Sequence, residues 1–237
     1  GMTLVIKIKV EQDLKSSVAR VVELIGGFGR VVSAGDRVMV KPNFNSDDPY
    51  PATTDLEFLK VVVQLLKEAG ANVVVGESSG AIWRPTKRVM ERLGALRQLT
   101  DMGAEVIAFD ERAWDWVRVR VDGDYIKEVT VSGSVYEADK IVYLPCMKTQ
   151  QLARFSLSLK LGVGLVHPGE RRRMHMGNLE RKIAEFSLAL QPDLIIMDGR
   201  KAFVSGGPAK GELVEPGVIM ASGDLVAIDV EALKILG

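Results

Sequence analysis

The chain alternates short apolar runs with longer segments in which apolar residues recur every three or four positions. Short apolar runs between turn residues are typical of buried strands, and the longer spacing is typical of helices with one buried face. The pattern predicts strands at 4–10, 38–40, 73–75, 105–109, 141–144, 194–197 and 218–221. It predicts helices at 11–24, between Asp55 and Gly70, at 86–93, at 178–190 and from Asp224 to Leu236.

This alternation predicts an α/β fold, with a mostly parallel sheet and helices on both faces. Two further runs, 117–121 and 126–131, flank the turn-forming Asp122-Gly123-Asp124, which predicts a β-hairpin insertion at about 114–132. No repeat, low-complexity tract or linker interrupts the pattern. We therefore expect a single α/β domain over residues 1–237.

Charge and length narrow the classes of function. The 237 residues can bury a core of useful size without a disulfide or a structural metal. Lysine and arginine total 31, as do aspartate and glutamate, so the net charge is zero. Nucleic-acid binding relies on excess basic residues, so this balance argues against nucleic-acid and membrane-surface partners. We interpret the one basic run, Arg171-Arg172-Arg173, as a solvated loop.

The single cysteine, Cys146, excludes an intrachain disulfide. It also excludes a self-contained iron–sulfur cluster, which usually needs four thiolates. No apolar run reaches the roughly 20 residues of a membrane span, and the start lacks the features of a signal peptide. These features lead us to expect a soluble, cytoplasmic protein.

Polar or small residues follow five of the predicted strands. In open parallel sheets, ligands bind beyond the carboxyl ends of the strands. Each segment alone is explained equally well as a turn, but five together favour one binding rim. The segments are Lys41-Pro42-Asn43-Phe44-Asn45, Gly76-Glu77-Ser78-Ser79-Gly80, Pro145-Cys146-Met147-Lys148-Thr149-Gln150, Asp198-Gly199-Arg200 and Ser222-Gly223-Asp224.

Lysines near glycine turns suit a carboxylate or phosphate ligand. The alternative is that each lysine extends its ammonium group to water, and for Lys160 the two readings are evenly balanced. The two glycine-rich segments, 76–80 and 206–211, have neither the spacing of a Walker A loop nor that of G-x-G-x-x-G. We therefore predict a small anionic ligand, and the predicted ligand-binding residues are Lys41, Asn43, Ser78, Ser79, Thr149, Gly207 and Asp224.

The candidate catalytic residues are Lys148, Glu77, Asp198 and His175. Carboxylates at a rim can transfer protons or hold a hard cation, so a divalent metal could bind here. No tight spacing such as H-E-x-x-H supports a metal site, and its identity stays unknown. Asp55 and Asp224 have a competing explanation as helix N-caps.

Two further features leave alternatives open. Residues 166–177 contain both histidines, are rich in Gly and Arg, and could form a mobile lid. Cys146 could act as a nucleophile or a soft ligand, but a buried, inert thiol is the better explanation.

An ordered set of short motifs resembles the DUF362 family of uncharacterised prokaryotic proteins. The resemblance covers about 38–237 and carries no established activity. Family members are often fused to ferredoxin-type modules, which implies an association with redox chemistry and a ferredoxin-like partner. The motifs are Lys41-Pro42-Asn43, Thr53-Thr54-Asp55, Gly76-Glu77-Ser78-Ser79-Gly80, Leu144-Pro145-x-x-Lys148-Thr149, Asp198-Gly199, Gly206-Gly207-Pro208 with Gly211, and Gly223-Asp224-x-x-Ala227-x-Asp229.

The chain departs from the family pattern at two positions. Gln150 stands where the pattern has histidine, and Leu161 stands where it has asparagine. Glutamine does not titrate near neutral pH and is a poor metal ligand, whereas His175 matches a later histidine of the pattern. The leading hypothesis is an enzyme that acts on a small anionic metabolite, with a link to redox chemistry. The alternative is a non-catalytic binding protein or a partner subunit of an iron–sulfur protein.

Overall fold

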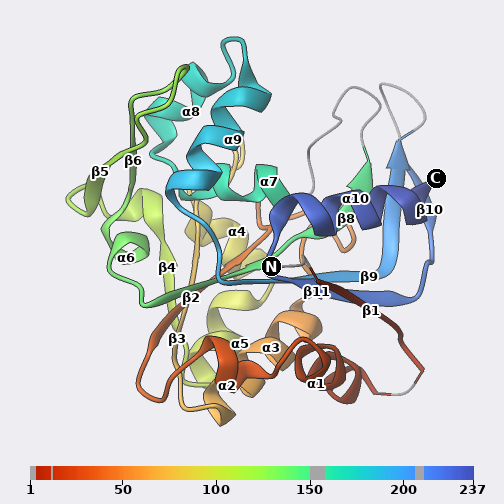
Figure 1. The fold of residues 1–237 in the computed structure, drawn as a ribbon. Coiled ribbons are helices and arrows are strands. Elements are labelled where there is room, and N and C mark those ends of the chain that lie inside the picture. The colour runs from red at the N-terminus through yellow and green to blue at the C-terminus, as the bar shows by residue number, and fades with distance from the viewer. Residues whose placement is uncertain (1–3, 12, 150–157, 206–210) are drawn as a thin grey trace.

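The computed structural model describes residues 4–11, 13–149, 158–205 and 211–237 (Figure 1). Within them, nine strands form one sheet in the order β1-β11-β9-β7-β2-β3-β4, with β8 and β10 also paired to β9. The strands are β1 (Val5–Lys9), β2 (Arg37–Pro42), β3 (Asn72–Glu77), β4 (Glu105–Ala108), β7 (Lys140–Leu144), β8 (Cys146–Thr149), β9 (Leu194–Ser205), β10 (Gly211–Val214) and β11 (Val218–Ser222).

The centre of the sheet is parallel. β2 pairs in parallel with β3 and β7, β3 with β4, and β9 with both β7 and β8. The fold is therefore α/β with a mostly parallel sheet, as the sequence predicts.

One edge of the sheet differs from the expected alternation of helices and parallel strands. β11 pairs antiparallel with β9, and β1 pairs antiparallel with β11, with Val5 opposite Ser222. Parallel neighbours need a crossover of a dozen or more residues, usually a helix. No helix separates β9 from β11 in the described residues, and β10 folds back antiparallel on β9. The chain therefore reverses direction at this edge instead of continuing the parallel pattern.

The predicted hairpin is present. β5 (Trp116–Arg120) and β6 (Glu128–Ser132) form a separate antiparallel pair, with Val119 opposite Val129. A single bridge from Val131 to Val166 connects the hairpin to the segment expected to be a lid. The described part of that segment is not an open loop, because it contains the helix α8 (Pro168–Met174).

The helices lie on both sides of the sheet and bury two apolar clusters against it (Figure 1). Val38 and Val40 point into one cluster and Met39 into the other, as the alternation of side chains along a strand requires. Helices on the first side are α1 (Leu14–Leu24), α2 (Phe28–Val31), α3 (Leu56–Glu68), α4 (Thr86–Arg92) and α5 (Ala95–Asp101). On the second side are α7 (Ser158–Leu161), the 3₁₀ turn η2 (Gly162–Leu165), α8, α9 (Leu179–Ala189) and α10 (Leu225–Leu236), while α6 (Gly133–Tyr136) and the 3₁₀ turn η1 (Phe109–Glu111) are short connections.

Aspartates begin several of these helices. The side chain of Asp55 accepts a hydrogen bond from the backbone N–H of Phe58, and that of Asp224 from the N–H of Ala227. Both are N-caps, which satisfy helix N–H groups that lack a partner within the helix. The sequence missed α5, which has only seven residues. In the described residues, no helix combines the length and apolar character needed to cross a bilayer.

The order of the strands marks where a ligand should bind. From β2 the chain moves outward through β3 to β4, then returns to the other side of β2 as β7 and continues to β9. Such a reversal is a topological switch point, and ligands bind beyond the carboxyl ends of the two strands beside it. Here those ends are Pro42 of β2 and Leu144 of β7.

Candidate functional site

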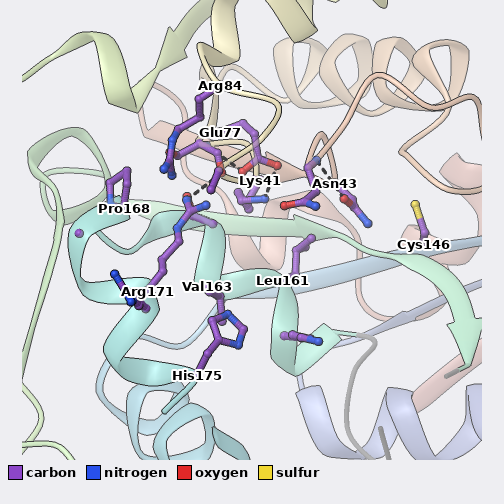
Figure 2. Close-up of a pocket in the computed structure, with 18 of the residues that line it drawn as sticks. Lys41, Asn43, Glu77, Arg84, Cys146, Leu161, Val163, Pro168, Arg171 and His175 are labelled. Atoms are coloured by element: carbon purple, nitrogen blue, oxygen red, sulfur yellow. Dashed lines mark hydrogen bonds and ion pairs between the residues drawn. The ribbon is translucent and has the colours of Figure 1, made fainter. Parts of the chain in front are cut away.

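A cavity of about 770 Å³ lies at these strand ends, beneath α7, η2 and α8 (Figure 2). Among the described residues that line it, six are lysines or arginines and one, Glu77, has a carboxylate. The lining comprises Lys41, Asn43, Asn45, Glu77, Ser78, Gly80, Ala81, Arg84, Cys146, Lys148, Lys160, Leu161, Val163, Gly164, Pro168, Gly169, Arg171, Arg172 and His175.

A buried ion pair forms one wall of the cavity. Lys41 Nζ lies 2.8 Å from Glu77 Oε2, and each side chain is 2% exposed. Glu77 Oε2 also accepts from the N–H of Phe44, and Oε1 accepts from the N–H of Ser78, both at 2.8 Å. Lys41 also donates to the carbonyl of Pro42. Burial lowers the pKa of Lys41, although Glu77 opposes that effect. Both carboxylate oxygens of Glu77 therefore already accept hydrogen bonds, and the ion pair joins β2 to β3.

Gly164 allows the η2 turn to approach this pair. A Cβ atom at that position would lie 2.5 Å from Glu77 Oε1 and 2.6 Å from Lys41 Cε. Real Cβ atoms essentially never come so close to other heavy atoms. A glycine is therefore required for the cover of the cavity to pack against its wall.

Arg171 holds α8 over the cavity. Its guanidinium donates to the carbonyl oxygens of Ser78 at 2.7 Å, Ser79 at 3.1 Å, Gly164 at 3.1 Å and Val166 at 3.2 Å. Burial lowers the pKa of this side chain. The interpretation of the basic run as a solvated loop is therefore wrong for Arg171. Arg172 and Arg173 are exposed, but they lie on the helix α8 rather than in a loop, and Arg172 also lines the cavity.

Four other cations face the cavity without a counter-ion. The side chains of Arg84, Lys148, Lys160 and Arg172 make no ion pair or hydrogen bond with any described residue. Burial lowers the pKa of Lys160, and nearby Lys148 lowers it further. Burial, Lys160 and Arg171 together lower the pKa of His175. His175 is therefore mostly neutral at neutral pH, beside uncompensated positive charge.

Smaller polar groups complete the lining. Ser78 is 1% exposed, and its hydroxyl has no hydrogen-bond partner among the described residues. The side chain of Asn43 accepts from the N–H of Asn45. Burial raises the pKa of Cys146 to about 11, so its sulfur is a protonated thiol and a weak nucleophile at neutral pH.

The cavity brings together six of the predicted site residues, and others lie apart from it. Ser79 is fully buried and donates to the carbonyl of Phe44 at 2.6 Å. Asp198 is 3% exposed and accepts two hydrogen bonds from the guanidinium of Arg200, at 3.0 and 2.8 Å. Arg200 also pairs with the capping Asp55 at 2.7 Å. Asp224, the cap of α10, lines a second, separate cavity of about 560 Å³.

Gly207 and Gln150 lie outside the described residues, and for Thr149 only the backbone pairing with Val204 is described. No group of three or more His, Cys, Asp or Glu side chains within the described ranges has an arrangement that would hold a metal ion.

The sequence missed three arginines of the cavity, Arg84, Arg171 and Arg172, as candidate site residues. None directly follows a strand, so the pattern of polar residues at strand ends does not include them. The only signal was the enrichment of Arg and Gly in 166–177, and it did not indicate which arginine turns inward.

The chain belongs to the DUF362 family, described as a domain of unknown function, whose model matches residues 38–234. It is 29% identical over 233 residues to thylakoid-associated protein sll1697 of Synechocystis sp., across 94% of this chain and 70% of that protein. Among solved structures it is similar to the lactate racemase apoprotein of Thermoanaerobacterium thermosaccharolyticum, with 11% identity and a TM-score of 0.49. That match covers 92% of this chain but 54% of the racemase chain, so this chain spans about half the racemase's length.

Proposed function

We propose that the chain is an enzyme that acts on a small anionic metabolite bound in the cavity beside β2 and β3. One observation carries the proposal: four cations face the cavity without a counter-ion in the described residues, in a chain whose net charge is zero. Gathering like charges in a partly desolvated cavity is unfavourable unless an anion offsets them. Such a cluster is typical of an anion-binding site.

Within this proposal, Lys148 and Lys160 bind the anion, and His175 accepts a proton from it. His175 suits this role because its lowered pKa leaves the imidazole neutral at neutral pH. The lysine ammonium groups would stabilise negative charge that develops on the substrate. Lys41 and Glu77, predicted as ligand-binding and catalytic, are assigned instead to positioning the strand ends, because each is already the other's partner.

Binding is tested first by thermal unfolding in the presence of inorganic phosphate and a panel of small carboxylates. We expect some of these anions to raise the melting temperature of the wild-type chain. Lys148→Ala and Lys160→Ala should remove that shift, because each removes a cavity cation. Lys9→Ala is the matched control, since Lys9 is an exposed lysine on the edge strand β1, which contributes no described residue to the cavity lining. Shifts that persist in both cavity variants would contradict the assignment.

Catalysis is tested with the anions that bind. Proton transfer from carbon should exchange a substrate C–H for deuterium in D₂O, which proton NMR detects as loss of signal. His175→Gln should retain binding and lose exchange. Exchange at the wild-type rate in His175→Gln would refute the role of His175.

One observation favours a second candidate, a binding protein without catalysis. Within the described part of the lining there is a single carboxylate, Glu77, and both of its oxygens already accept hydrogen bonds. Of the described lining side chains, His175 is then the best suited to proton transfer near neutral pH. Tight binding without turnover of any bound anion would favour this candidate. The ferredoxin-like partner, the redox link and the cytoplasmic location stay predictions, and co-purification with an iron–sulfur protein would support the first.

A further inference from the structure

Three of the four cations without partners lie in two parts of the cavity. Lys148 and Lys160 form the lysine end, where Lys148 is close enough to lower the pKa of Lys160. Arg84 marks the arginine end, where it is close enough to lower the pKa of Arg171, whose guanidinium binds the carbonyl oxygens of Ser78 and Ser79. The exposed Arg172 also lines the cavity. The cavity therefore carries positive charge in two places.

The two groups lie toward different ends of the site. Cys146 lies on the opposite side of the Lys41–Glu77 pair from Arg84 (Figure 2). It lies two residues before Lys148 on β8, and the charge of Lys148 acts to lower its pKa. The side chains of Leu161 and Val163 lie between Arg171 and Cys146 (Figure 2), and both line the cavity. The space between the two positive ends therefore has an apolar wall.

This arrangement selects for the shape of the ligand as well as for its charge. The Lys41–Glu77 pair between the ends is internally neutralised, so it offers no further charge to a ligand. A single small anion would neutralise one end and leave positive charge unpaired at the other. A ligand with an anionic group at each end would satisfy both, and its middle would contact the apolar wall.

We propose that the ligand is an organic dianion, with carboxylate or phosphate groups at the two ends of a short apolar spacer. This inference rests on the proposed function and specifies its substrate class. The charged groups would contact the lysine end and the arginine end, and the spacer would lie against Leu161 and Val163.

Isothermal titration calorimetry at constant ionic strength tests the proposal with matched probes. The dianions are the α,ω-dicarboxylates from succinate to suberate and ω-phosphonocarboxylates of the same lengths. The monoanions are n-alkyl carboxylates of equal carbon number, so hexanoate is the control for adipate. At the best spacer length we expect the dianion to bind on the order of 10-fold or more tightly than its monoanion, because it gains a second charge-assisted contact.

Variants of each end locate the two contacts. Arg84→Gln and Lys160→Gln should each weaken the best dianion on the order of 10-fold, whereas a monoanion should lose affinity in only one of them. Neither side chain has a partner in the described residues, so both variants should fold, and Lys9→Gln is the charge-matched control.

The outcomes separate this inference from the proposed function. If dianions bind no more tightly than their monoanions at every length, or if one end's variant leaves the best dianion unaffected, the inference is overturned while anion binding stands. If no carboxylate, phosphonate or inorganic phosphate binds, the proposed function fails and the inference fails with it.

Discussion

The Lys41–Glu77 pair allows a quantitative test of how the wall of the cavity is held. At 2.8 Å, an ion pair in an effective dielectric of about 20 gains about 6 kcal/mol of Coulomb energy. Removing water from two ions costs several kcal/mol each, so the intact pair is worth little more than well-packed apolar side chains. Removing one partner is different, because it leaves the other charge buried without compensation, at about 3–5 kcal/mol.

The perturbations are Lys41→Met, Glu77→Gln and the double variant. We expect each single change to lower the free energy of unfolding by about 3–5 kcal/mol. Lys41→Met should lie at the lower end of that range, since Glu77 keeps its bonds from the N–H groups of Phe44 and Ser78. The double variant should cost at least about 2 kcal/mol less than the sum of the single changes, because it leaves no ion unpaired.

The assay is urea unfolding at 25 °C, followed by circular dichroism, with the slope compared among variants to confirm two-state behaviour. Lys15 and Glu68 provide the matched control, because their N–O distance is also 2.8 Å but each side chain is 47% exposed. The same substitutions there should show far weaker coupling. Additive costs at Lys41 and Glu77, or equal coupling in the two pairs, would refute the reasoning that burial decides the value of the pair.

Three further predictions concern the elements around the cavity. Asp229 accepts hydrogen bonds from the N–H groups of Ser158 and Leu159, and burial raises its pKa from 3.8 to about 6. The stability it contributes is complete below about pH 4 and lost as pH rises through 6. Asp229→Asn should therefore be more stable than wild type at pH 8, by up to about 3 kcal/mol, with no gain at pH 4; a pH-independent difference would contradict this. Gly164→Ala should cost about 1–3 kcal/mol because its Cβ overlaps Glu77 Oε1, whereas Gly29→Ala, with open space around its Cβ, should cost little; equal costs in urea unfolding would exclude the steric reason. Cys146, with a pKa of about 11, should react with iodoacetamide at pH 8 on the order of 100-fold more slowly in the folded chain than in urea, and comparable rates would show that the thiol is not buried as described.

Local patterns in the sequence predicted most of the fold. The unbroken run Val73-Val74-Val75 became β3, paired on both sides and buried on both faces, because a strand inside a parallel sheet has no polar face. The turn Asp122-Gly123-Asp124 marked the hairpin, and the expected helix at 178–190 is α9. The antiparallel edge was missed because strand direction depends on which connections contain a helix. β9 continues to Ser205, beyond the predicted end at Met197, because its second half pairs with β10 and β8, and those pairings are not visible in the local pattern.

The sequence by itself determined the α/β class, the hairpin, the caps at Asp55 and Asp224, and the presence of polar residues at strand ends. These are local properties, set by periodicity and by hydrogen bonds between residues a few positions apart. Only the tertiary structure decided which polar residues meet. It paired Lys41 with Glu77, separated Asp198 from the cavity and turned Arg171 inward. The physical reason is that a side chain's charge becomes available to a ligand only if the fold gives it no other partner. Partners such as Glu77 for Lys41 and Ser78 for Arg171 lie far away in sequence, so local patterns do not reveal them.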